Sequence, residues 1–215
     1  MSRTTRRRTI RAVAPVAGLL AAGLLVWQGS YAAFSAQTTS QADAWATGSL
    51  VLANNGGVGS TYSGNTSALF SLGSLKSSDS GARCITVDSS GSLAGTLKLF
   101  SGAITDVNTA NPTSNLSSKL NLVITAAALT NDDSVDASCV AGTGTVAFPA
   151  AATAVYSGNL SGLGTSYAAS AGAGMSVSAG ADHRTAYKIA WSLDPSIDNS
   201  YQSASTKADL TWEIQ

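Results

Sequence analysis

After Trp45 the chain alternates apolar and polar residues over short stretches, which is the period of β-strands with one buried face. The clearest stretch is 185–193, where every second residue from Tyr187 onward is large and apolar. The closing stretch, 205–214, places Ala, Leu, Trp and Ile opposite Lys, Asp, Thr and Glu, as an antiparallel strand with one wet side would. Weaker matches are 49–53, 68–72, 83–88, 95–100, 119–125, 145–148 and 153–158.

These stretches are separated by clusters of Gly, Ser, Asn and Asp, the residues that build turns. About nine short strands at this spacing predict an all-β fold, a jelly-roll-like antiparallel β-sandwich, rather than a parallel α/β sheet. No sustained helical period occurs after residue 47, although 160–173 is ambiguous. We therefore expect a β-sandwich domain over residues 47–215, preceded by an extended N-terminal arm.

The first 32 residues have a different pattern, which predicts a secretory signal peptide. Five arginines lie within the first eleven residues, and the apolar run 12–27 follows without a charge. Small residues then lead to Ala32, so we expect a signal peptidase to cut between Ala32 and Ala33. Two alternatives stay open: an uncleaved anchor, since a span needs about 20 residues, and export by the twin-arginine route.

Removal of residues 1–32 changes the charge of the protein. The whole chain is formally neutral, with 12 Lys and Arg against 12 Asp and Glu. The mature part keeps 7 of the basic residues and all 12 acidic ones, so its net charge is −5. Because it has no basic stripe with aromatic residues, nucleic acid is not an expected partner. We expect a secreted protein of the extracellular matrix or cell surface, which meets the membrane only through its signal segment.

Export also decides how the two cysteines are interpreted. Cys84 and Cys139 both lie in the mature part, and an even pair in an oxidising compartment predicts a disulfide. The bond would close a loop of about 55 residues and contribute on the order of 4 kcal/mol through chain entropy.

Motifs for catalysis and for metal binding are missing from the sequence. The chain has one histidine, His183, which is expected to begin a strand at the surface, and no His-Glu-x-x-His pattern for a catalytic zinc. A Gly-x-Ser-x-Gly elbow, a dinucleotide fingerprint and a phosphate loop are also missing. We therefore expect no enzyme activity, no cofactor and no bound metal.

Other polar residues have structural interpretations. Asp132, Asp133 and Asp136 could bind calcium, but the EF-hand Gly and Glu are missing, so a solvated loop is favoured. Asp194 and Asp198 are expected to flank a turn before the last strand. Glycosylation sequons arise easily in a chain so rich in Ser and Thr, and they begin at Asn65, Asn115 and Asn159.

The segment 33–46 differs in kind from the strands that follow it. Two separated aromatic residues, Phe34 and Trp45, flank a polar middle that tolerates an extended conformation. One interpretation is a flexible arm that packs these aromatic residues on its own sandwich. The other is a strand that leaves its own domain and pairs with the sheet of another subunit.

The exit of the predicted signal peptide, 29–34, reads Gly-Ser-Tyr-Ala-Ala-Phe, and 46–50 reads Ala-Thr-Gly-Ser-Leu. This junction and the strand after it resemble the start of the TasA/camelysin family of exported Gram-positive proteins. Segments 83–87, 187–193 and 209–213 resemble members of the family as well. The likeness covers both ends and the order of strands, and the middle of the chain matches by length and pattern.

The resemblance implies a jelly-roll sandwich that a dedicated signal peptidase processes and that several family members assemble into biofilm-matrix fibres. In those fibres the mature N-terminal segment adds as a strand to the next subunit, which is donor-strand complementation. Such head-to-tail contacts need not close and so form homopolymers. The donor here would run from residue 33 to about residue 45, with Phe34 and Trp45 as anchors. Its candidate residues are Ala33, Phe34, Ser35, Ala36, Gln37 and Trp45.

Two other functions remain as alternatives. The family name carries a metalloendopeptidase label, but the lone His183 leaves the expected zinc ligands missing. The other alternative is a monomeric cell-surface binding module, for glycans for example, that uses exposed aromatic residues. Its candidate residues are Tyr62, Tyr156, Tyr167 and Tyr201. Other matrix or cell-wall components are further candidate partners of a fibre.

Overall fold

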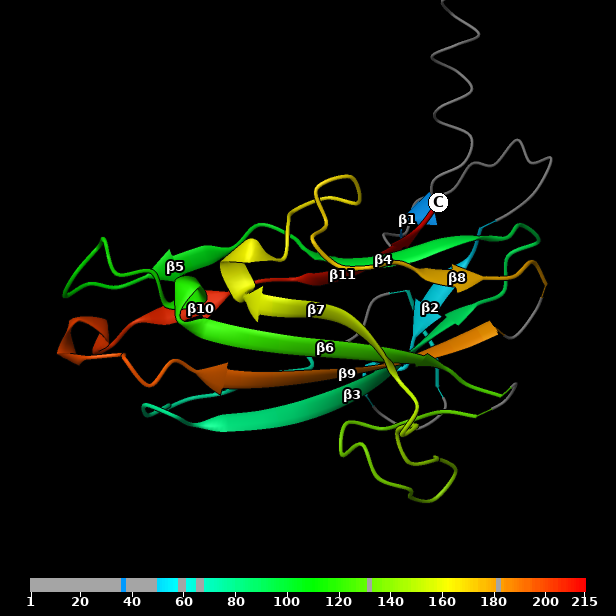
Figure 1. The fold of residues 1–215 in the computed structure, drawn as a ribbon, viewed down its shortest axis with the longest axis horizontal. Helices are drawn as coiled ribbons and strands as arrows, with labels where there is room; N and C mark the ends of the chain where they lie inside the picture. Colours follow the sequence, from blue (N-terminus) through cyan, green and yellow to red (C-terminus); the bar gives the residue numbers. More distant parts are fainter. Residues whose placement is uncertain (1–35, 38–49, 58–60, 65–67, 131–132, 181–182) are drawn as a thin grey trace, which may run out of the picture. The chain divides into compact units, whose positions relative to one another are not determined.

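The structure is a computed structural model and describes residues 36–37, 50–57, 61–64, 68–130, 133–180 and 183–215 (Figure 1). The predicted signal peptide, its cleavage point between Ala32 and Ala33, and the donor residues Phe34, Ser35 and Trp45 lie outside this part. Within the described residues, no helix has the length and apolar character to cross a membrane.

Antiparallel strands form two main sheets in the described part of the chain (Figure 1). One has the order β1-β11-β4-β8, and the other has the order β2-β3-β9-β6-β7. The first sheet contains β1 (Ala36–Gln37), β11 (Leu210–Ile214), β4 (Gly95–Ser101) and β8 (Met175–Val177). The second contains β2 (Leu52–Asn54), β3 (Ser80–Ser89), β9 (His183–Leu193), β6 (Leu120–Ala128) and β7 (Thr153–Asn159). The predicted all-β antiparallel fold is confirmed, and its finer description as a jelly roll stays a prediction.

A short ladder of two strands continues the first sheet. In it β5 (Thr105–Val107) pairs with β10 (Ser205–Lys207), just beyond the pairing of β4 with β11. Three residues, 102–104, separate β4 from β5, whereas two residues, 208–209, separate β10 from β11. The chain that runs from β4 to β5 therefore carries one extra residue. This bulge splits the predicted strand 205–214 into two pieces, although the chain keeps its direction.

The core lies between the two main sheets and contains the residues that the two-residue period predicted. From β9 it receives Tyr187, Ile189 and Trp191, which alternate with half-buried or small residues. From β11 it receives Trp212 and Ile214. The rings of Tyr187 and Trp212 meet edge to face across the sandwich, with centroids 5.8 Å apart and planes 65° apart, an arrangement favoured by the ring quadrupoles. The alternation therefore identified correctly which face of each of these strands is buried.

Two predicted strands were wrong. Residues 68–72 are irregular, because Leu69 and Phe70 pack on the core through their side chains without a backbone ladder. Residues 145–148 form no strand either, since backbone bonds from Val146 and Phe148 hold this segment across its own loop. Strands β5 and β8, with three residues each, were not predicted. The ambiguous stretch 160–173 contains the 3-10 turn η2 (Leu160–Gly162) and an irregular loop.

The cysteine pair anchors a long loop on the outer face of the second sheet. Cys84 and Cys139 form the predicted disulfide, with their Cα atoms 5.2 Å apart. Cys84 and Val135 are fully buried, and the half-buried Val146 and Phe148 pack around them in a cluster separate from the main core. This loop, 129–148, thus covers part of a sheet face that would otherwise be exposed to solvent.

The polar residues near the last strands lie as the sequence predicted. His183 is the first residue of β9, where it is half-buried. Asp194 and Asp198 each accept a backbone hydrogen bond at 2.8 Å, from Ser196 and Ser200 respectively. The second bond caps η3 (Asn199–Tyr201), so both carboxylates build the turn region before β10.

Candidate assembly site

Two residues of the predicted arm form an edge strand of the first sheet. Ala36 and Gln37 make up β1, which pairs antiparallel with the end of β11. The opposed Cα positions are Ala36 with Ile214 and Gln37 with Glu213. This part of the arm therefore adds by main-chain pairing, and it does so at the outer edge of the C-terminal strand (Figure 1).

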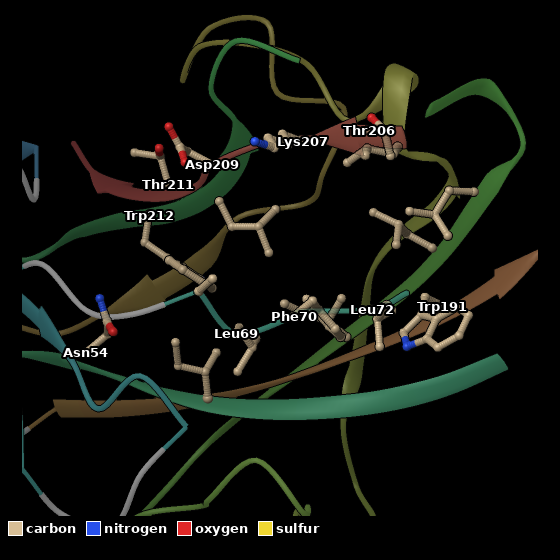
Figure 2. A pocket seen from close by; sticks show the side chains of 18 of the residues that line it. Asn54, Leu69, Phe70, Leu72, Trp191, Thr206, Lys207, Asp209, Thr211 and Trp212 are labelled. Carbon is tan, nitrogen blue, oxygen red and sulfur yellow. The ribbon is translucent and has the colours of Figure 1, made fainter. Parts of the chain in front are cut away.

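An apolar cavity of about 670 Å³ lies between the sheets beside the same strand (Figure 2). Its floor consists of core residues of β3, β6 and β9, among them Ile85, Leu122 and Trp191. The irregular segment 68–72 forms another wall through Leu69 and Phe70. Leu72, which is 43% exposed, also lines the cavity, so its interior reaches the surface there.

The wall of the cavity nearest the sheet edge is the continuous segment 206–212, in which every second residue belongs to a stripe that faces the core. Thr206 on β10 and Trp212 on β11 bound this stripe, and Ala208 and Leu210 lie between them. Figure 2 shows the side chain of Trp212 directed into the cavity from its strand. The segment 206–212 therefore presents both a backbone edge and a row of inward side chains to whatever enters.

Two polar atoms of this stripe lack hydrogen-bond partners among the described residues. The indole Nε1 of Trp212 is buried in a residue that is only 5% exposed, and the Oγ1 of Thr206 is buried beside the cavity. A buried donor without an acceptor costs about 1–3 kcal/mol.

The opposite side of the sandwich is closed by the loop after β7. Leu163 is fully buried there, and its carbonyl accepts a backbone bond from Ala171 at 3.1 Å. The backbone N–H of Ala173 donates to Val155 on β7 at 2.8 Å, and the hydroxyl of Tyr167 donates to Thr96 on β4 at 2.9 Å. Loop 160–174 thus ties β7 to β4 and fills this side, whereas the β11 side contains the cavity.

A second exposed edge belongs to β3. The first four residues of this strand, 80–83, are exposed, because β2 pairs only with positions 87–89. Further along, the N–H of Cys84 donates to Ala137 and the N–H of Thr86 donates to the side chain of Asn55. Loop contacts therefore cover the middle of this edge and leave its beginning open.

The residues considered for metal binding form no cluster within the part of the chain that the structure describes. Among the described residues, no three His, Cys, Asp or Glu side chains are placed to hold a metal ion together. Asp132 lies outside the described residues, and Asp136 accepts hydrogen bonds from the backbone and hydroxyl of Ser138. Those bonds lower the pKa of the Asp136 carboxyl, because they favour its charged form. The carboxylate thus has a local structural role in loop 129–148.

The tyrosines considered for ligand binding are engaged within the chain. The ammonium of Lys98 lies 4.8 Å from the centroid of the Tyr167 ring, and the guanidinium of Arg184 lies 4.8 Å from that of Tyr62. Tyr156 donates to the carbonyl of Asn159 at 2.6 Å. The fourth tyrosine, Tyr201, is half-buried in η3.

Comparison with known proteins gives no family and no relative: no family description and no curated protein matches the chain. The open strand edge and its apolar cavity therefore stand on the geometry of the chain itself. Sequence reasoning had placed the arm as a donor, but it missed the cavity. The cavity is lined by the apolar segment 68–72 and by part of the alternating stretch 205–214, and the sequence pattern did not show what these two segments pack against.

Proposed function

We propose that the protein is a secreted structural subunit of extracellular matrix fibres, and that its mature N-terminal segment adds as a strand to the next subunit. The pairing of Ala36 and Gln37 with β11 is the observation that supports this proposal. It places residues of the predicted donor segment in strand conformation at a sheet edge. A strand supplied by a neighbour makes the same main-chain bonds, and its side chains fill alternate pockets.

The composition of the mature chain favours association of like subunits. With 7 basic and 12 acidic residues, its charge density is low, so repulsion between copies is weak. A head-to-tail contact between a strand and an edge is heterologous, and it extends into a filament when the rotation does not close. The partners of this function are a signal peptidase, further copies of the chain, and other matrix or cell-wall components.

The test compares the mature protein that starts at Ala33 with a variant that lacks residues 33–46. We expect filaments in electron micrographs of the first sample and monomers in size-exclusion chromatography of the second. A matched control carries the residues of 33–46 in scrambled order, which preserves length and composition but moves Phe34 and Trp45. Filaments that form equally well without the segment would contradict the proposal.

A further inference from the structure

We infer that the outer edge of β11, continued by β10, is the acceptor edge for a neighbour's arm, and that each subunit's own β1 caps this edge before assembly. The inference rests on the proposed function and adds two statements to it. One identifies the receiving surface. The other makes assembly an exchange, in which pairing within a chain is replaced by pairing between chains.

The hydrogen-bonding pattern of the first sheet identifies this edge. On one side β11 pairs with β4 along its whole length, from Leu210 to Ile214. On the other side, within the part of the chain that the structure describes, it pairs with β1 at Glu213 and Ile214. Among the described strands, positions 210–212 and the outer side of β10 have no ladder partner. A strand that entered here would pair with the outer side of β11 and β10 and widen the sheet.

The apolar cavity supplies the pockets that an added strand needs. The inward stripe of the same edge, from Thr206 to Trp212, is one of its walls. A strand laid beside this edge would point every second side chain into a space of about 670 Å³, which is enough for several apolar side chains.

The exposed beginning of β3 does not offer these features. Gly81 and Arg83 are the positions opposite Trp191 and Ile189, so they share the core-side face of the sheet. The indole of Trp191 already fills the space over Gly81, where a Cβ atom would lie 3.0 Å from its Nε1. Arg83 is charged and exposed. A strand added there would meet the Trp191 ring and an exposed charge, which favours β11 over β3.

The subunit concentration decides whether β11 pairs with the arm of its own chain (cis) or with that of a neighbour (trans). The cis pairing has the advantage of a tether, because a short linker gives the arm a high effective concentration at its own edge. A neighbour's arm has the same sequence and would pair with the same edge of β11, so mass action raises its share as the subunit concentration rises. Trans pairing is therefore favoured at high subunit concentration, after release of β1.

The decisive experiment locks β1 onto its own strand. In the double variant Gln37→Cys with Glu213→Cys, the two thiols replace directly opposed residues, so oxidation of the dilute monomer should link them. A matched control, Ser80→Cys with Ser192→Cys, staples the opposed strands β3 and β9 and leaves the arm free. Mild reduction releases both staples, and mass spectrometry verifies that the buried Cys84–Cys139 bond stays intact.

We expect the oxidised arm-locked variant to stay monomeric, and to form filaments after mild reduction, while the oxidised control assembles throughout. Filaments of the arm-locked, oxidised protein would overturn the inference, and so would failure of the two thiols to link in the monomer. The variant that lacks residues 33–46 distinguishes failure of this inference from failure of the proposed function. If that deletion still abolishes filaments, the proposed fibre function stands even when the β11 acceptor edge is wrong. Absence of filaments from the unmodified mature protein would remove both.

A second readout identifies the acceptor edge directly. The arm-locking variant is assembled in reduced form and then oxidised within the filaments. We expect a ladder of covalent oligomers on a non-reducing gel, because the thiol introduced by Gln37→Cys in each subunit would face the β11 of its neighbour. A parallel variant with Thr211→Cys in place of Glu213→Cys covers a register shifted by two residues. Monomers alone from both filament preparations would exclude β11 as the acceptor.

Discussion

Replacement of both cysteines by alanine tests how much of the fold depends on the Cys84–Cys139 bond. The bond spans 55 positions of sequence, a stretch that contains β4, β5 and β6. Loop-closure entropy for that length gives about 4 kcal/mol of stabilisation. Cys84 is also fully buried against Val135, so loss of its sulfur adds about 1 kcal/mol. The double variant should thus lose about 5 kcal/mol, against a typical total of about 5–15 kcal/mol.

Urea unfolding followed by tryptophan fluorescence provides the measurement. Trp191 and Trp212 are buried in the core, so their emission reports loss of the main core and not of the loop alone. The wild-type protein without reductant is the reference, and reduced wild type should behave like the double variant. A loss below about 1 kcal/mol in the free energy of unfolding would refute the entropic reasoning, because the closed loop would then not restrict the unfolded chain.

Three further predictions concern single side chains. Gly57→Ala should destabilise the protein by about 2–4 kcal/mol, because φ is +73° and the new Cβ would lie within about 3 Å of its neighbours. Gly144→Ala has a similar φ of +75° but meets no atoms within 4 Å, so it should cost about 1–2 kcal/mol. Equal losses in urea unfolding would contradict this difference. The lowered pKa of Asp136 means that its contribution is present above the unfolded pKa of about 3.9 and is lost as pH falls through the folded value, so Asp136→Asn should flatten the acid side of the stability profile. Burial raises the pKa of Tyr187, so above about pH 10 the folded state binds more protons than the unfolded state and stability should fall. Tyr187→Phe should reduce that fall, and it should cost no stability at pH 7 because the hydroxyl has no partner among the described residues.

The extent to which the sequence predicted the fold depends on the kind of information each element needs. Strand β9 was predicted almost to the residue, because its large side chains recur at every second position over its whole length. Residues 68–72 show the limit of that signal. Their apolar side chains are indeed used by the core, but a strand also needs a neighbour for its backbone, and local pattern does not report one. The three-residue strands β5 and β8 are too short to show a period at all.

For the candidate assembly site, too, some features follow from the sequence and others only from the tertiary structure. The sequence alone determined the all-β class, the buried face of the last strands, the pairing of the only two cysteines, and a candidate arm before the domain. Only the tertiary structure decided that loop 160–174 fills one side of the sandwich, while an apolar cavity remains beside β11, where Ala36 and Gln37 pair. The reason is physical: a two-residue period determines which way a side chain points, whereas the order of strands in a sheet follows from contacts between residues far apart in the chain.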